Sequence, residues 1–134
     1  MAIILDTDVI IRGERGTFDL NRWLASQRDE EIQIAAITVA ELWHGVERAS
    51  SAYRVERQDY IRKILSLVKI LPYTETTSLT HAQVWAELES SGKMIGFYDL
   101  IVAAAALEHG SAVVTFNQRH FTQVRGLTVI EPKL

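Results

Sequence analysis

The chain has 134 residues, of which 48% are hydrophobic and 23% are charged, with a formal net charge of −3. This length and composition predict one globular domain over residues 1–134, and the acidic balance is unlike the basic surface of many nucleic-acid-binding proteins. The absence of cysteine excludes disulfides and thiolate metal sites, and without an apolar run of about 18 residues or a secretion signal we expect a cytoplasmic protein with no membrane contact.

Apolar runs and helical spacing predict alternating strands and helices. Ile3-Ile4-Leu5 belongs to a short apolar run of the kind found in buried strands, whereas Leu42 and Val46 recur at helical spacing. In chain order we expect a strand over 2–5, a loop over 12–16, a helix over 18–28, a strand over 32–37, a helix opening at Thr38, a helix over 52–69, a strand over 70–73, helices over 80–90 and 98–109, and strands over 112–115 and 127–130. This alternation predicts the α/β class, with three α/β/α layers and a mainly parallel central sheet.

Polar side chains follow several of the predicted strands at the point where each strand ends. Asp6 follows the first strand, Thr38 and Glu41 follow the second, and Asn117 follows the strand over 112–115. In open parallel sheets, ligands bind beyond the carboxyl ends of the strands. We therefore expect these side chains to meet at one edge of the sheet.

Each acid near this edge also has an ordinary structural interpretation. Asp6 or Asp8 can form an Asx turn or cap a helix N-terminus. Thr38 and Glu41 have the spacing of a capping box, in which the glutamate bonds back to a backbone N–H. Asp99 at a helix start interacts favourably with the helix dipole. For any one acid, the local sequence leaves both interpretations open.

Taken together, the acids favour a metal site. Asp6, Glu41 and Asp99 lie beside strand ends or helix starts in a chain with no thiol nucleophile. Clustered carboxylates repel one another unless they are protonated or bound to a cation. Oxygen ligands of this kind suit Mg²⁺ or Mn²⁺, and a divalent ion also attracts a phosphodiester to a negatively charged protein. The sequence therefore predicts that these three carboxylates hold Mg²⁺ (or Mn²⁺).

Four segments, taken in order, resemble the PIN domain and most closely the VapC-type toxins of toxin–antitoxin pairs. The first two are Leu5–Ile10, with the first acid, and Ile37–Val46, with the second. The third is Ile95–Ala104, around Asp99, and the fourth is Val114–Phe121. The resemblance covers essentially the whole chain and implies a PIN-like fold.

The resemblance also implies an activity and a set of site residues. It implies a divalent-metal-dependent endoribonuclease that hydrolyses RNA phosphodiester bonds, with Asp6 as a metal ligand. Thr38 and Asn117 would then orient ligands or the attacking water. Asp8, Thr115 and His120 are auxiliary candidates. Candidates for contacts with RNA phosphates are Arg119, Arg48 and Lys93.

One residue departs from the family pattern. The fourth segment usually carries an acid before its phenylalanine, and this chain has His120 there. His120 could bind a substrate phosphate or a transition metal, or it could be a neutral polar residue at the edge of the sheet. Asp8 is a candidate to supply part of the missing negative charge. The departure also motivates an alternative function, a catalytically weakened subunit that acts by binding a DNA-binding antitoxin and supporting operator binding.

The resemblance implies partners as well. These are a cognate antitoxin protein, an RNA substrate such as tRNA, and a second copy of the chain in a homodimer. Exposed apolar residues of the predicted 52–69 helix are compatible with that dimer.

Overall fold

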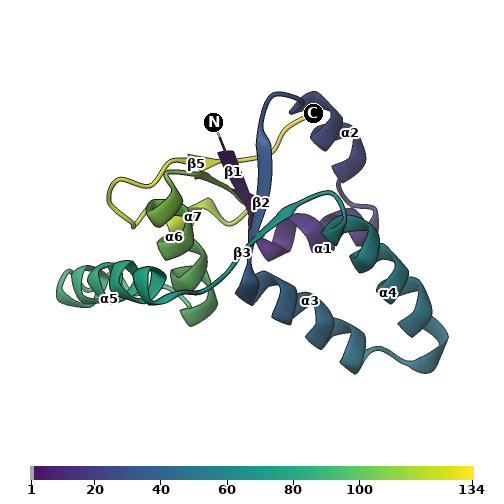
Figure 1. Cartoon of the computed structure of the whole chain (residues 1–134), viewed down its shortest axis with the longest axis horizontal. Coiled ribbons are helices and arrows are strands. Elements are labelled where there is room, and N and C mark those ends of the chain that lie inside the picture. The colour runs from purple at the N-terminus through teal and green to yellow at the C-terminus, as the bar shows by residue number, and fades with distance from the viewer. Residues whose placement is uncertain (1) are drawn as a thin grey trace.

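A computed structural model describes residues 2–134, which form three layers around a parallel sheet (Figure 1). The strands are β1 (Ala2–Leu5), β2 (Glu31–Ala35), β3 (Lys69–Leu71), β4 (Ala112–Val114) and β5 (Val129–Ile130). Their order is β3-β2-β1-β4-β5, and every pairing is parallel. The predicted α/β class and parallel sheet are confirmed. Because β1 is central and is flanked by β2 and β4, the ends of these three strands lie side by side.

Helices cover both faces of the sheet. They are α1 (Thr7–Arg15), α2 (Leu20–Ser26), α3 (Ala36–Arg48), α4 (Ser51–Leu65), α5 (Glu75–Ser90), α6 (Phe97–His109) and α7 (Gln118–Phe121). Helices α5 and α6 lie on one side of the sheet, and α1 to α4 on the other (Figure 1). None of these helices has both the length and the apolar composition needed to cross a membrane.

The apolar run of β1 is explained by burial on both faces of the sheet. Ile4 packs into the core under α5 and α6, whereas Ile3 and Leu5 pack into the core under α1 to α4. Side chains alternate between the faces of a strand, so a strand covered on both sides is apolar at successive positions. This packing holds the strand end that carries Asp6 in a fixed place.

The prediction of a loop over residues 12–16 is wrong, because α1 continues to Arg15. Gly13 lies inside this helix, where a Cβ would come within 2.7 Å of the Tyr60 hydroxyl and 2.8 Å of Leu20 Cβ. The glycine therefore marks a close approach between segments, and not a break in the helix. The helix ends at Gly16, whose φ of 76° lies in the left-handed region that glycine adopts readily.

Several other boundaries differ from the prediction. α5 begins at Glu75 and not at residue 80, because Thr74 and Thr77 form a capping box at its N-terminus. β2 ends at Ala35 and α3 begins directly at Ala36, so Thr38 is already inside the helix. The short helix α7 was not predicted from the sequence. These shifts leave the order of the predicted strands unchanged.

Candidate active site

Asp6 lies where β1 ends and α1 begins, and it is almost fully buried, with 5% of its surface exposed. Its Oδ1 accepts a hydrogen bond from the Thr7 backbone N–H at 2.9 Å, so it caps α1. Its Oδ2 accepts a bond from the Thr115 hydroxyl at 2.8 Å. Since Thr115 follows β4, the neighbour of β1, the predicted meeting of strand ends is observed.

Thr115 and Asp8 join α1 to the segment after β4. The Thr115 hydroxyl, which is fully buried, also accepts a hydrogen bond from the Asn117 backbone N–H at 2.9 Å. Asp8 lies in the first turn of α1, and its Oδ2 accepts a bond from the Phe116 N–H at 3.2 Å. The Arg12 guanidinium lies 4.3 Å from the centre of the Phe116 ring. Asp8 therefore fastens this segment to α1.

Glu41 is connected to the same edge through Thr7. The Thr7 hydroxyl donates to Glu41 Oε1 at 2.7 Å and lies 3.2 Å from the Thr38 hydroxyl oxygen. The capping-box interpretation of Thr38 and Glu41 is wrong, because α3 begins at Ala36 and Glu41 bonds to a side chain of α1. Thr7 was missed in the sequence, although its place between two acids at a strand end was the available signal.

Asp99 lies in the first turn of α6 and faces the segment after β4. Its Oδ2 is 3.0 Å from His120 Nδ1, and the same ring nitrogen is 2.9 Å from Asn117 Nδ2. The Asp99 side chain is 24% exposed and that of His120 is 49% exposed. The pair therefore forms the open part of a site whose Asp6 side is closed.

Burial and mutual repulsion raise the pKa of the site's carboxyls. Burial is the main cause that raises the pKa of Asp6 to about 7, and the charges of Asp8 and Asp99 raise it further. The hydrogen bond from Thr115 opposes this increase. Burial also raises the pKa of Asp8. For Glu41, burial is again the main cause of a raised pKa, and the charge of Asp99 adds to it. Asp99 thus acts on both Asp6 and Glu41, and one network of hydrogen bonds links the three carboxylates through the threonines, Asn117 and His120 described above.

This arrangement fits a hard divalent cation in the type of its ligands. The raised pKa values mean that the ionised form of these carboxyl groups is disfavoured. A bound cation would stabilise that ionised form. Within residues 2–134, no three carboxylate or imidazole groups converge closely enough to enclose an ion by themselves. An ion such as Mg²⁺ usually keeps several waters and binds only one or two carboxylates directly. The remaining carboxylates would therefore contact the ion through bound water molecules.

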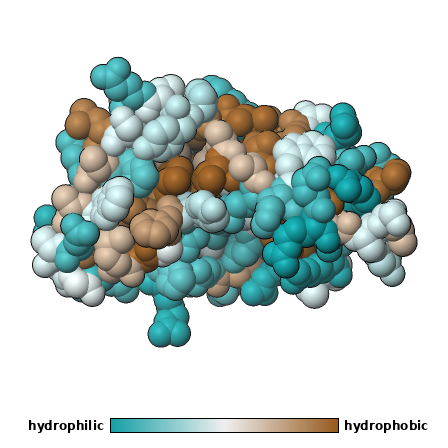
Figure 2. All heavy atoms as spheres, turned by 90° about the horizontal axis from the view of Figure 1, so that it is seen from below, coloured by the Kyte–Doolittle hydropathy of each residue, from teal (hydrophilic) through white to brown (hydrophobic). Residues whose placement is uncertain are grey.

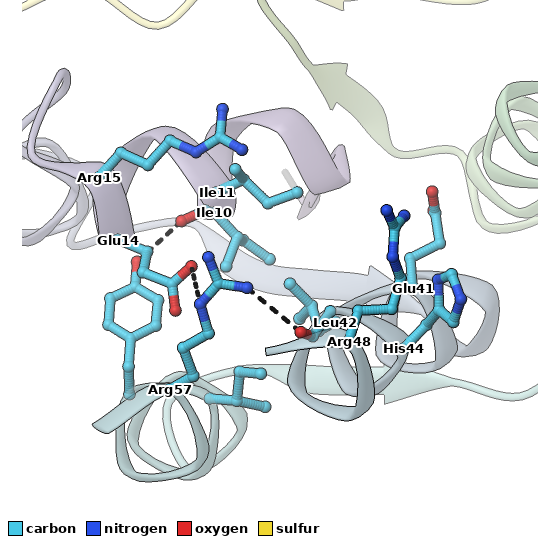
Figure 3. Close-up of a pocket in the computed structure, with 12 residues that line it drawn as sticks. Ile10, Ile11, Glu14, Arg15, Glu41, Leu42, His44, Arg48 and Arg57 are labelled. Carbon is cyan, nitrogen blue, oxygen red and sulfur yellow. Dashed lines mark hydrogen bonds and ion pairs between the residues drawn. The ribbon is translucent and has the colours of Figure 1, made fainter. Parts of the chain in front are cut away.

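A groove of about 400 Å³ runs from Glu41 between α1, α3 and α4 (Figure 3). Its charged lining includes Arg15, Arg48 and Arg57. Arg57 is engaged within the protein, since its Nη1 donates to the Gly45 carbonyl at 3.2 Å and its Nε lies 3.9 Å from Glu14 Oε1. Arg48 is exposed and lies with Glu41 at one end of the groove (Figure 3).

The three predicted RNA contacts are at different places in the structure. Arg48 is the last residue of α3 and lines the groove. Arg119 is exposed on α7, next to His120, and Lys93 is exposed in the segment that joins α5 to α6. Neither Arg119 nor Lys93 lines the groove, so the structure does not bring the three together in one patch.

Comparison with known proteins gives the family. Residues 3–127 match the model of the PIN domain. The chain is 31% identical over 131 residues to Ribonuclease VapC1 of Rickettsia felis, which covers 97% of this chain and 96% of the relative. The chain belongs to the PIN-domain family of VapC ribonucleases. The resemblance found in the four sequence segments is thus confirmed.

One further related protein and one solved structure are similar to this PIN domain over almost its whole length. The tRNA(fMet)-specific endonuclease VapC of Shigella flexneri is 28% identical, over 95% of both chains. The crystal structure of DNA-bound VapBC from Salmonella typhimurium matches with a TM-score of 0.85 and 25% identity, over 96% of both chains. The fold of this PIN domain therefore agrees with a solved VapBC structure over almost its whole length.

Proposed function

We propose that residues 1–134 form one PIN domain that is a divalent-metal-dependent endoribonuclease and the toxin of a toxin–antitoxin pair. The observation that carries this proposal is the network of hydrogen bonds that joins Asp6, Glu41 and Asp99, in which the pKa values of Asp6 and Glu41 are raised. The names of the relatives support RNA as the substrate, and the Shigella flexneri relative supports tRNA as its class.

In this proposal, Asp6, Asp99 and Glu41 hold Mg²⁺ (or Mn²⁺), partly through water. When bound there, such an ion would lower the pKa of a water molecule and would stabilise negative charge on the phosphoryl oxygens. The Thr115 and Thr7 hydroxyls fix the orientation of Asp6 Oδ2 and Glu41 Oε1 by the hydrogen bonds described above. A fixed carboxylate needs no rearrangement when charge develops during the reaction.

Thr38 and Asn117 act on the site through other side chains. Thr38 is fully buried against the Thr7 hydroxyl and limits its movement. The Asn117 side chain contacts His120, and its backbone N–H bonds to Thr115. Both are therefore proposed as positioning residues.

Removal of divalent ions tests this proposal directly. Purified protein treated with a chelator is expected to leave an RNA substrate intact, and added Mg²⁺ or Mn²⁺ is expected to restore cleavage. Gel analysis of a tRNA mixture measures both. Cleavage at an unchanged rate in excess chelator would show that the reaction does not depend on a metal.

The alternative of a binding subunit with a weakened site has less support. This alternative is based on His120, which stands where the family usually has an acid. However, Ribonuclease VapC1 and the Shigella flexneri endonuclease both have names that state an RNA-cleaving activity. A cognate antitoxin remains a proposed partner of the enzyme. The VapBC structure from Salmonella typhimurium supports that proposal. Because that structure is bound to DNA, it also supports a complex with the antitoxin that binds DNA.

Arg48 is proposed to contact an RNA phosphate along the groove. Replacing it with Ala is expected to raise KM about five- to tenfold at moderate salt with little change in kcat, because one charge-assisted contact to phosphate contributes about 1–1.5 kcal/mol. The effect should shrink as salt rises. Arg54→Ala is the control, because Arg54 is paired with Glu47 at 2.8 Å on the surface and does not line the groove. Equal losses in both variants would indicate a general effect of net charge.

The predicted helix does carry exposed apolar residues, Tyr53 and Val55 of α4, but we propose another surface for the homodimer. A second hollow, of about 360 Å³, is lined by small and apolar residues of α3, β3 and α6, including Ile37, Ala40 and Leu71. Trp85 and Phe97 are exposed on the neighbouring α5 and α6. Figure 2 shows apolar surface in the middle of this face, whereas much of the right-hand part, where α4 lies, is hydrophilic. Contiguous exposed apolar surface usually marks an interface.

A substitution in this hollow tests the dimer. Ala40→Glu, at an exposed helical position, is expected to convert a dimer into a monomer, since a buried unpaired carboxylate costs several kcal/mol. Light scattering during size exclusion measures the mass. Tyr53→Glu on α4 is the control, and the dimer should survive it. If Tyr53→Glu separates the copies and Ala40→Glu does not, α4 carries the interface.

A further inference from the structure

Arg12 lies on α1, about one helical turn after Asp8, and the function proposed above gives it no task. Its guanidinium carbon is 4.3 Å from the centre of the Phe116 ring, in the segment that follows β4. We propose that Arg12 binds a phosphate of the RNA that neighbours the cleaved phosphate, and that Phe116 holds the guanidinium in place for this contact. This inference rests on the proposed function, because RNA is the ligand.

Phe116 is itself fixed by two contacts. Its backbone N–H donates to Asp8 Oδ2 at 3.2 Å, and its ring meets the Phe18 ring edge to face, with the ring centres 5.1 Å apart. A guanidinium over the face of an aromatic ring is attracted by that ring. Because Arg12 is already restrained in this way, it loses less conformational freedom on binding a ligand than a freely moving arginine would.

The hydrogen-bond donors of Arg12 are available for a ligand. The side chain is exposed, and within residues 2–134 its guanidinium forms no hydrogen bond or ion pair. A guanidinium that stacks through its face keeps the N–H groups along its edge free, and these match two oxygens of a phosphate. The structural alternative is that an arginine in the last turn of α1 only interacts with the helix dipole. That role predicts no effect on RNA.

The position of Arg12 relative to the acids suits a neighbouring phosphate. Asp8 lies between Arg12 and Asp6, because Asp8 Oδ1 is 3.4 Å from the Thr115 hydroxyl that bonds to Asp6. Burial raises the pKa of Asp8 and the charge of Arg12 opposes that increase, so Arg12 is close enough to act on this acid. The rise from Asp8 to Arg12 along α1 is about 6 Å. This offset is comparable to the spacing of successive phosphates along a nucleic-acid strand.

Arg12 also lies outside the groove that starts at Glu41. Arg48 lines that groove, whereas Arg12 does not line it and faces the segment after β4. An RNA strand that contacts both arginines would therefore pass across the acids. A strand that is cut in its interior extends on both sides of the cleaved bond, as these two contacts require.

Steady-state cleavage of a tRNA mixture with Mg²⁺ provides the first test. Arg12→Met keeps an unbranched stem against the ring and removes the charge and the donors. It is expected to raise KM about five- to tenfold with little change in kcat, because one charge-assisted contact to phosphate is lost. Arg62→Met is the matched control and should leave KM unchanged. Arg62 is likewise exposed, with its guanidinium carbon 5.6 Å from the centre of the Trp43 ring, but it lies on α4 and does not line the groove.

A second measurement locates the phosphate. Sequencing of RNA ends first maps the cleavage site, and oligonucleotides that span it are then made with one neighbouring phosphate at a time replaced by an uncharged methylphosphonate beside a 2′-deoxy sugar. At one position this replacement is expected to weaken cleavage by the parent and by Arg62→Met about five- to tenfold, with little further effect on Arg12→Met. Oligonucleotides with the same 2′-deoxy sugar and a normal phosphate are the control.

The outcomes separate this inference from the proposed function. If Arg12→Met has the KM of the parent, or if every methylphosphonate weakens its cleavage as much as that of the parent, Arg12 binds no RNA phosphate and the metal-dependent nuclease stands. Equal losses in Arg12→Met and Arg62→Met also overturn the inference, because they would reflect net charge alone. Absence of cleavage by the parent protein with Mg²⁺ or Mn²⁺ contradicts both proposals.

Discussion

Asp6→Asn is expected to slow RNA cleavage about a thousandfold while the protein remains folded. A metal ion stabilises the charge of a phosphoryl-transfer transition state by several kcal/mol, and each 1.36 kcal/mol is a factor of about ten in rate. Asparagine keeps the shape of the side chain and can still cap α1 through its amide oxygen. The substitution therefore removes the charge with little structural change. Initial cleavage rates at saturating Mg²⁺ measure the effect.

Two variants serve as comparisons for this loss. Asp99→Asn should cause a loss of similar size, because Asp99 belongs to the same hydrogen-bonded network of acids. Asp19→Asn is the matched control, since Asp19 also caps a helix, accepting a bond from the Arg22 N–H at 3.1 Å, but it lies on the exposed N-terminus of α2. Asp19→Asn should cleave RNA at the parental rate. If Asp6→Asn does so as well, the assignment of Asp6 is wrong.

The same Asp6→Asn change is expected to stabilise the metal-free protein. Burial raises the pKa of Asp6 from 3.8 to about 7, so the folded state favours the protonated acid. The stability contributed by this protonation is fully present below the unfolded pKa and is lost as the pH rises through the folded pKa. Above pH 7 the ionised, buried carboxylate therefore costs on the order of 2–4 kcal/mol. Asparagine does not titrate and avoids this cost.

Thermal unfolding without metal, at about pH 8 and about pH 5, measures this prediction. Near pH 8 the variant should melt several degrees higher than the parent, and the gain should shrink near pH 5. Added Mg²⁺ should reverse the order, because an ion that binds only the folded parent stabilises it. A variant that melts lower than the parent at both pH values would show that the hydrogen bonds of Asp6 outweigh its buried charge.

The strands and the edge of the sheet were predictable because burial leaves a strong pattern in the sequence. Ile3, Ile4 and Leu5 are all apolar because both faces of β1 are covered. The rule that parallel strands end at one edge then placed Asp6 near the segment that follows β4. Helix boundaries were less predictable. The pattern around Gly13 resembled a loop, since the contact that requires glycine involves Tyr60, which is distant in sequence.

The detailed contacts of the site depend on angles between elements, which no local pattern contains. The Thr38 and Glu41 spacing fitted a capping box, yet Glu41 instead reaches the Thr7 hydroxyl on another helix. The closeness of Asp99 and His120 follows from how α6 meets α7, and their separation in sequence gave no sign of it. The acids could thus be named as a group, but their hydrogen-bond partners could not.

The glycine inside α1 also determines the dimensions of the groove. The space that a Cβ at Gly13 would fill is taken by the Tyr60 hydroxyl, which donates to the Ile10 carbonyl at 2.9 Å and so ties α4 to α1. Tyr60 and Ile10 both line the groove. A Cβ at position 13 would have to displace the Tyr60 hydroxyl and the Leu20 side chain of α2. The contact of Tyr60 with α1 at this wall of the groove therefore depends on the absence of a single methyl group.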